Sequence, residues 1–133
     1  MNRLGNIIYY VKDVAKTVDF FEKAFGIERQ FIDETGVYAQ MKTGNTALGF
    51  AEQKFAQTLV PNGFTPLSPD KPFGQEISFC SDEPKEAYAR AIECGCKEIT
   101  PLKAKEWGQV VGHLLTPDGI LVEIASEMEM KDE

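Results

Sequence analysis

The chain contains one pattern twice, and this duplication constrains its fold more than any other feature. The first copy, IIYYVKDVAKTVDFFEKAFG, spans Ile7 to Gly26, and the second, EISFCSDEPKEAYARAIECG, spans Glu76 to Gly95 without a gap. Each copy has a β-prone apolar run, an aspartate, apolar residues at helical spacing and a final glycine. One supersecondary unit that occurs twice in 133 residues predicts two similar modules.

The first copy opens a unit of one strand, one helix and three further strands. Asn6–Val11 is β-prone and apolar, as expected for a strand covered on both faces. Asp13 stands at a helix N-cap position, and Gly26 follows the last helical turn. Shorter alternating runs come next, with a hairpin turn predicted at Lys42–Asn45. The apolar stripe of the helix comprises Val14, Val18, Phe21 and Phe25.

The second copy opens a unit with the same plan. Asp82 is the predicted N-cap of its helix, and Pro84 lies in the first turn. The closing hairpin turns at TPDG, Thr116 to Gly119, which has Pro and Gly where a type I turn favours them. The predicted strands of this unit are Gln75–Cys80, Ile99–Leu102, Trp107–Leu115 and Ile120–Ser126.

The segment Gln53–Gly74 is expected to connect the two units, because it has little periodicity and contains four prolines, at positions 61, 66, 69 and 72. We therefore expect a single domain with four parts. These are module one at about 5–52, the connection at 53–74, module two at about 75–126 and a charged tail at 127–133.

The composition argues against several classes of function. The formal net charge of −7 and the lack of a basic stripe oppose binding to nucleic acid. No apolar run approaches the ~18 residues of a membrane span, and the N-terminus lacks a signal-peptide pattern, so we expect a cytoplasmic protein without a membrane partner. Cys80, Cys94 and Cys96 lack zinc-pair spacing and are expected to be reduced, mostly structural thiols.

Two βαβββ units with a strand-Asp-helix-Gly opening and a TPDG hairpin resemble the vicinal oxygen chelate superfamily. Its members include glyoxalase I, bleomycin-resistance proteins, fosfomycin-resistance enzymes and extradiol dioxygenases. The resemblance covers nearly the whole chain, and its most specific parts are Tyr9 to Gly26 and TPDGILVEI, Thr116 to Ile124. It implies an α+β fold in which two βαβββ modules form a cup-shaped, partly closed mixed sheet with helices outside. It also implies a homodimer.

The resemblance further implies where a metal would bind. Metal-using members place ligands at the start of the first strand of each unit, here Asn6 and Gln75, and near the end of each closing hairpin. The hairpin positions are Glu123 in the second unit and Leu48 or Gly49 in the first. Leu48 and Gly49 have no donor side chain, and amides are weak ligands. We therefore expect no cofactor, and expect a divalent metal, if one is present, on Gln75 and Glu123.

Strand alternation predicts which residues line the cup. If Asn6, Gln75 and Glu123 point inwards, apolar and aromatic side chains share their side, as in a pocket for a small organic molecule. The neighbours on that side are Ile8, Tyr10, Ile77, Phe79, Leu121 and Ala125. The predicted ligand-binding residues from these strands are Asn6, Tyr10, Gln75 and Phe79.

His113 and Glu123 are the candidate catalytic residues. His113 is the only histidine, and it lies ten positions before Glu123 across the TPDG turn. In fosfomycin-resistance enzymes, which this hairpin resembles, a residue with that spacing faces the ligand. An imidazole beside a carboxylate suits general-base work. Alternatively, His113 is a partly buried strand residue and Glu123 is the polar relic of a metal site. Glu52 is either a substitute metal ligand or a solvated residue at a strand end.

The remaining predicted ligand-binding residues lie on the hairpin strands. Trp107 and Gln109 share the strand parity of His113 and are expected at the rim of the cup, where the indole either stacks on a flat ligand or packs under the loop. Tyr38 is the approximate counterpart of His113 in the first unit, with Gln40 on the same side.

The sequence favours a protein, similar to bleomycin-resistance proteins, that binds a small organic molecule in the cup without the usual metal. One alternative is a metal-dependent lyase or dioxygenase of the same superfamily. Another is a metal-free lyase or isomerase in which Glu123, helped by His113, removes a proton. Whether the protein is an enzyme stays open at this point.

Overall fold

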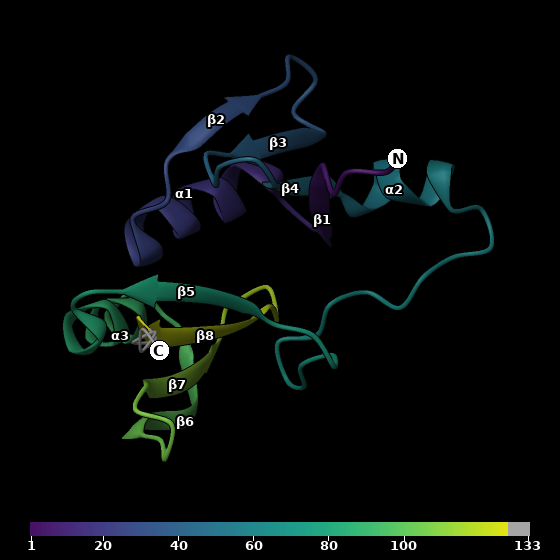
Figure 1. Ribbon diagram of the computed structural model, residues 1–133. Coiled ribbons are helices and arrows are strands. Elements are labelled where there is room, and N and C mark those ends of the chain that lie inside the picture. Colours follow the sequence, from purple (N-terminus) through teal and green to yellow (C-terminus); the bar gives the residue numbers. More distant parts are fainter. Residues whose placement is uncertain (128–133) are drawn as a thin grey trace. The chain divides into compact units, whose positions relative to one another are not determined.

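The computed structural model describes residues 1–127. Contacts divide the chain into two compact units, of which the first is Met1–Leu67 and the second begins at Ser68 (Figure 1). Each unit contains a βαβββ-like module with a four-stranded mixed sheet, which confirms the predicted α+β fold. The cup that the sheets are expected to form stays a prediction. The predicted tail, 127–133, lies outside the described residues except for Glu127.

The first module is a sheet with strand order β1-β4-β3-β2, and α1 lies along one face of it (Figure 1). Strand β1 is parallel to β4, whereas the other two pairs are antiparallel. The predicted hairpin turn joins β3 to β4. The strands are β1 (Asn6–Val11), β2 (Arg29–Ile32), β3 (Tyr38–Met41) and β4 (Ala47–Glu52), and the helices are α1 (Val14–Phe25) and α2 (Gln53–Leu59).

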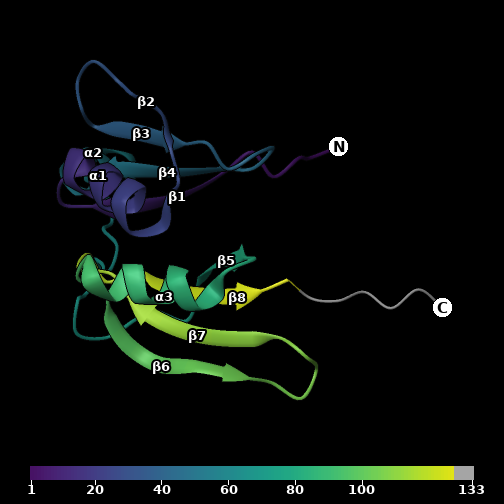
Figure 2. The same ribbon diagram turned by 90° about the vertical axis from the view of Figure 1, so that its left-hand side faces the viewer.

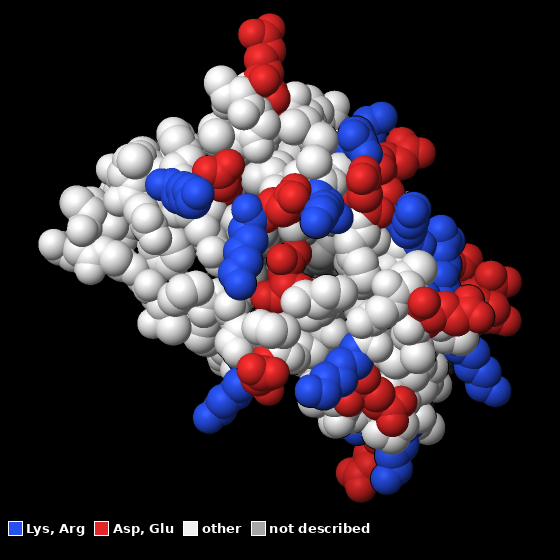
Figure 3. Space-filling view, turned by 180° about the vertical axis from the view of Figure 1, so that it is seen from behind, with Lys and Arg blue, Asp and Glu red and all other residues white. Residues whose placement is uncertain are grey.

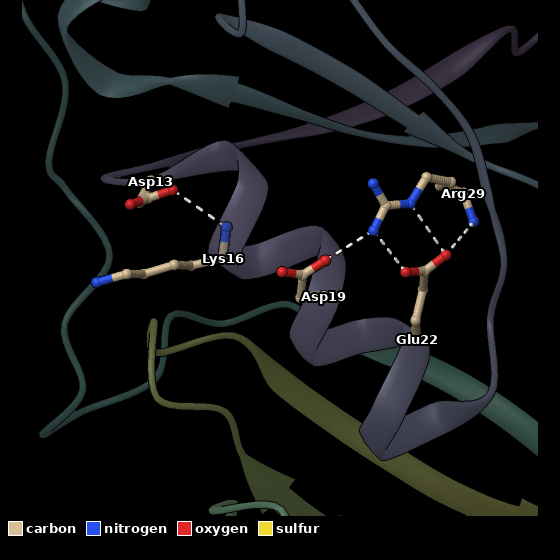
Figure 4. Close-up of polar contacts among 5 residues, drawn as sticks. All are labelled: Asp13, Lys16, Asp19, Glu22 and Arg29. Atoms are coloured by element: carbon tan, nitrogen blue, oxygen red, sulfur yellow. Dashed lines mark hydrogen bonds and ion pairs between the residues drawn. The ribbon is translucent and has the colours of Figure 1, made fainter.

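Helix α1 forms where the sequence predicts it. The Asp13 carboxylate accepts a hydrogen bond from the backbone N–H of Lys16 at 3.1 Å and so caps the helix (Figure 4). Gly26 has a φ of 67°, a left-handed conformation that glycine adopts with little strain, and it closes the last turn. Phe21 is fully buried, and its ring centroid lies 4.9 Å from that of Phe50 in β4. This aromatic pair anchors α1 to the sheet.

Arg29, at the start of β2, connects that strand to the outer side of α1 (Figure 4). Its guanidinium donates to Glu22 through Nε at 3.1 Å and Nη2 at 2.7 Å, and to Asp19 at 2.7 Å. The hydrogen bonds from Arg29 lower the pKa of Glu22, and those to Glu22 raise the pKa of Arg29. These side chains are largely exposed, so the network orients β2 more than it stabilises the fold.

The second module repeats the arrangement with strand order β5-β8-β7-β6, and α3 lies over its sheet (Figure 2). Strand β5 is parallel to β8, and the other pairs are antiparallel. The TPDG turn forms as predicted, with the Gly119 N–H donating to the Thr116 carbonyl at 2.9 Å. The elements are β5 (Ile77–Ser81), α3 (Pro84–Glu93), β6 (Lys97–Ala104), β7 (Val110–Leu115) and β8 (Leu121–Ser126).

Helix α3 begins one residue later than the sequence indicates, which corrects the alignment of the two copies. Its N-cap is Glu83, not Asp82, and Pro84 is the first helical residue. Proline is favoured there because the first helical N–H has no partner within the helix. Asp13 therefore corresponds to Glu83, and the strand before α3 is shifted by one residue as well.

The connection between the modules contains a helix that the sequence pattern does not predict. Helix α2 occupies Gln53–Leu59, and the described chain then has neither helix nor strand before β5. Ala56 is its buried residue, whereas Phe55 and Leu59 are exposed. One buried alanine creates no helical periodicity in the sequence, which explains the miss. Across residues 1–127, no helix has the length and apolar character needed to cross a bilayer.

Candidate functional site

The candidate site lies on the face of the second sheet that points away from α3. Gly112 of β7 faces α3, because a Cβ at Gly112 would lie 2.9 Å from the Tyr88 ring of that helix. Its neighbour His113 therefore points to the opposite face. Glu123 of β8 pairs directly with His113, so its side chain shares that face.

Three titratable side chains meet there: Glu76, His113 and Glu123. The Nε2 atom of His113 lies 3.4 Å from Oε1 of Glu76 and 3.4 Å from Oε2 of Glu123. The side chains of Glu76, His113 and Glu123 are 38%, 25% and 22% exposed, so a molecule in solvent can reach all of them. A half-buried imidazole between two carboxylates can accept hydrogen bonds, move a proton or hold a cation.

Two hydroxyl groups orient this cluster from neighbouring strands. Ser78 of β5 donates to Oε1 of Glu123 at 2.6 Å, and Thr100 of β6 lies with its Oγ1 2.8 Å from Nδ1 of His113. His113 and Glu123 therefore lie close together, as predicted. Each side chain also forms a hydrogen bond with one of these hydroxyl groups. Sequence reasoning missed Ser78 and Thr100, because neither belongs to a motif and only the strand register brings them here.

The sequence predicts Gln75 at the strand-start position of the second unit, whereas the structure places the next residue, Glu76, in the cluster. Ser78 pairs with Glu123, so Glu76 and Ser78 share the face of the cluster, whereas Phe79 pairs with buried Ile124. Gln75 precedes β5, which begins at Ile77, and it is not one of the three side chains that meet in the cluster. The cause is the later start of α3, because counting back from Glu83 instead of Asp82 leads to Glu76.

The environment of Glu76 favours its protonated form. Partial burial raises the pKa of Glu76, and repulsion from the nearby Glu123 carboxylate raises it further, while His113 opposes the shift. Ionisation of Glu76 therefore lowers the free energy of unfolding. The cluster is in this respect typical of functional sites, where like charges are held together at the expense of stability.

Replacing Glu76 by glutamine should stabilise the protein near neutral pH and have little effect in acid. Below the pKa of 4.5 that the carboxyl has in the unfolded chain, it is protonated in both states and does not change the stability of the protein. As the pH rises through the higher pKa of the folded state, ionisation of the carboxyl lowers that stability. Since the side chain is 38% exposed and solvent screens it, the gain should be about 0.5 kcal/mol or less. Thermal unfolding of the wild-type protein and of Glu76→Gln, at about pH 7 and about pH 4, measures this difference in stability. A stabilisation of the same size at both pH values would contradict this account.

Comparison with known proteins identifies the family. The model of the Glyoxalase/Bleomycin resistance protein/Dioxygenase superfamily matches residues 3–124. This chain belongs to that superfamily. A glyoxalase-related enzyme from Fulvimarina pelagi has a similar structure, with a TM-score of 0.80 and 18% identity, covering 96% of this chain and 89% of that one. A superfamily enzyme from Burkholderia phytofirmans PsJN gives a TM-score of 0.73 at 16% identity, covering 94% and 98%.

A sequence relative extends over almost the same length. The uncharacterized protein YraH of Bacillus subtilis (strain 168) is 25% identical over 123 residues, which is 92% of this chain and 96% of that protein. These similarities establish the superfamily and the fold. The ligand, the metal status and the homodimer that the superfamily resemblance implies stay predictions.

The first module has no counterpart of the cluster at the superfamily's ligand positions. Gly49 pairs with Ile8 and Gln40 as Glu123 pairs with Ser78 and His113, so Gly49 takes the place of Glu123. Gln40, rather than Tyr38 as expected, therefore corresponds to His113. A Cβ at Gly49 would lie 2.5 Å from the Tyr38 hydroxyl, so the tyrosine fills the space of a side chain there.

Tyr10, Tyr38 and Gln40 share one face of the first sheet, because Tyr10 and Tyr38 both pair with Ala51 and Gln40 pairs with Gly49. Asn6 is exposed at the start of β1 and pairs with Ala47, while Glu52 pairs with Val11 at the other end of the two strands. Glu52 thus does not join Asn6 as a substitute ligand. Tyr10 packs against Phe64 with ring centroids 4.9 Å apart, and the Tyr38 hydroxyl donates to Gln40 at 3.0 Å.

Trp107 and Gln109 precede β7, which begins at Val110 rather than at Trp107 as predicted. The Trp107 indole N–H donates to the Gln109 side chain at 2.7 Å, and the Gln109 amide donates to the Ser126 carbonyl at 2.9 Å. Trp107 is 61% exposed, so its ring does not pack under the loop. The indole is held at the end of the sheet with its surface available to solvent.

Two further features bear on function: the charged side chains on the face drawn in Figure 3 and the three thiols. Figure 3 shows basic side chains interspersed with acidic ones on the face that it draws, which is typical of a solvated surface. All three cysteines are free. Burial raises the pKa of the Cys96 thiol to about 12, which keeps it protonated and unreactive, as expected for a structural thiol.

Proposed function

We propose that this superfamily member binds a small organic molecule with a hydrogen-bond-donating group, an amine or a hydroxyl, at Glu76, His113 and Glu123. One observation carries the proposal: Nε2 of His113 lies 3.4 Å from an oxygen of each carboxylate. Ionised carboxylates are acceptors only, and bonds that they accept from charged donors are about twice as strong as neutral ones. A ligand carboxylate would meet like charge and should bind poorly.

The proposal does not depend on a metal held by four ligands from both modules. The first-module positions that correspond to the cluster are Asn6, Gln40 and Gly49, none of which has a charged side chain that could bind a metal. The second module alone supplies one imidazole and two carboxylates on one exposed face. For a bound molecule with an acidic proton, the carboxylate of Glu123 is a neighbouring base, and His113 lies 3.4 Å from it.

Amines and alcohols should perturb this cluster, and carboxylic acids should not. The test is a series of matched aromatic fragments that differ only in a primary amine, a hydroxyl or a carboxylate, titrated into ¹⁵N-labelled protein. We expect the amine and hydroxyl fragments to shift the amide signals of Glu76, His113 and Glu123. Equal shifts with the carboxylate fragment, or shifts confined to other regions, would overturn the proposal.

A second candidate function is the binding of a divalent cation by the same three side chains. It is favoured by their ligand atoms, which all lie within 4.8 Å of one another, and by an N/O donor set that suits zinc or manganese. Such an ion would supply Lewis-acid chemistry, with Glu76, His113 and Glu123 as its ligands. Titration calorimetry with ZnCl₂ and MnCl₂ tests it. Binding that persists unchanged in His113→Ala would exclude this site.

A further inference from the structure

Strand β6 contains an irregularity beside the cluster. Glu98 pairs with Leu114 and Thr100 pairs with His113, so two residues of β6, Ile99 and Thr100, match one step of β7. This is a β-bulge, and a bulge changes which side chain of a strand points to a given face. In a regular ladder, Ile99 would stand opposite His113. The extra residue places the Thr100 hydroxyl there instead.

The hydroxyl reaches the ring nitrogen that does not face the carboxylates. Thr100 Oγ1 lies 2.8 Å from Nδ1 of His113, while Nε2 faces Glu76 and Glu123. A hydroxyl can donate or accept a hydrogen bond. If Nε2 carries the proton, Thr100 donates to Nδ1. If Nε2 accepts a hydrogen bond from a ligand, Nδ1 carries the proton and donates to Thr100.

We infer that Thr100 is a positioning residue for His113: its hydroxyl holds the imidazole with Nε2 towards the two carboxylates in either tautomer. This inference deepens the proposed function. It rests on that function only for the class of ligand that binds at Nε2. Among residues 1–127, the Thr100 hydroxyl is hydrogen-bonded to His113 and to neither carboxylate, so it acts through His113. Groups that orient a metal-ligating imidazole contribute about tenfold or more to affinity, and we expect an effect of about tenfold for Thr100.

The experiment uses the fact that His113 is the only histidine, so each ring nitrogen gives one assignable signal. We expect Thr100→Val, which keeps the shape and loses the hydroxyl, to shift the Nδ1 resonance towards that of a nitrogen without a hydrogen bond. Thr100→Ser should retain the wild-type signal. Spectra are recorded without ligand, in buffer above the range where histidine titrates. Thr58→Val, whose hydroxyl donates to the Phe55 carbonyl in α2, is the matched control.

The same variants are then titrated with the amine fragment. We expect about tenfold weaker binding for Thr100→Val and unchanged binding for Thr100→Ser and Thr58→Val. Unchanged ring signals in Thr100→Val would overturn the inference. If the ring signals respond but the amine fragment does not bind even the wild-type protein, the proposed ligand class fails while the role of Thr100 stands.

Discussion

Replacing Phe21 by alanine should lower the free energy of unfolding by about 3–5 kcal/mol, the usual cost of removing a buried phenylalanine. The side chain is fully buried in the first module. Its ring contacts Phe50 at 4.9 Å and Phe25 at 5.1 Å between centroids, so truncation leaves a cavity between α1 and the sheet. Domains are typically stable by only about 5–15 kcal/mol, so this loss is a large share of the total. Urea unfolding followed by circular dichroism measures it.

The matched control is Phe55→Ala in α2, because Phe55 is 38% exposed. Its loss should be less than about 1 kcal/mol, as for substitutions away from the core. If Phe21→Ala does not fold, Phe21→Leu should fold with a loss of about 1 kcal/mol, since it largely conserves volume. Equal losses for Phe21→Ala and Phe55→Ala would show that the aromatic pair does not anchor α1.

Replacing Glu123 by glutamine should weaken binding of an amine fragment by about ten- to a hundredfold. Glutamine has nearly the same shape and keeps an acceptor for the Ser78 hydroxyl, which donates to Glu123 at 2.6 Å. It removes the charge, and a hydrogen bond to a charged group is worth about 1.5–3 kcal/mol. At about 1.4 kcal/mol for each factor of ten, that loss gives the stated range. Fragment titrations by NMR measure the affinity.

The control for this variant is Glu106→Gln, which changes the net charge equally. Glu106 is exposed between β6 and β7 and forms no ion pair with another residue of the described chain. Its substitution should leave the affinity unchanged. Equal weakening by both variants would assign the effect to overall charge. An unchanged affinity in Glu123→Gln would remove Glu123 from the binding site.

Sequence reasoning located much of the candidate site but not its full composition. The pairing of His113 with Glu123 followed from their spacing across the TPDG turn, which a two-stranded hairpin turns into direct contact. The sequence predicted Gln75 at the strand start, because Asp82 was taken as the helix cap, whereas the cap in the structure is Glu83. This error of one residue put an amide where the cluster has the carboxylate of Glu76.

The duplicated βαβββ plan, the caps of α1 and the TPDG turn could be predicted, because they depend on residues close together in the chain. The side chains that meet in the candidate site follow from how the strands pair and pack. The bulge at Ile99 brings Thr100 to His113, and the Tyr38 ring occupies the space at Gly49, where the second module has Glu123. A bulge in one strand and the packing of one ring against the next strand set these arrangements, and the alternation of residues within a single strand specifies neither.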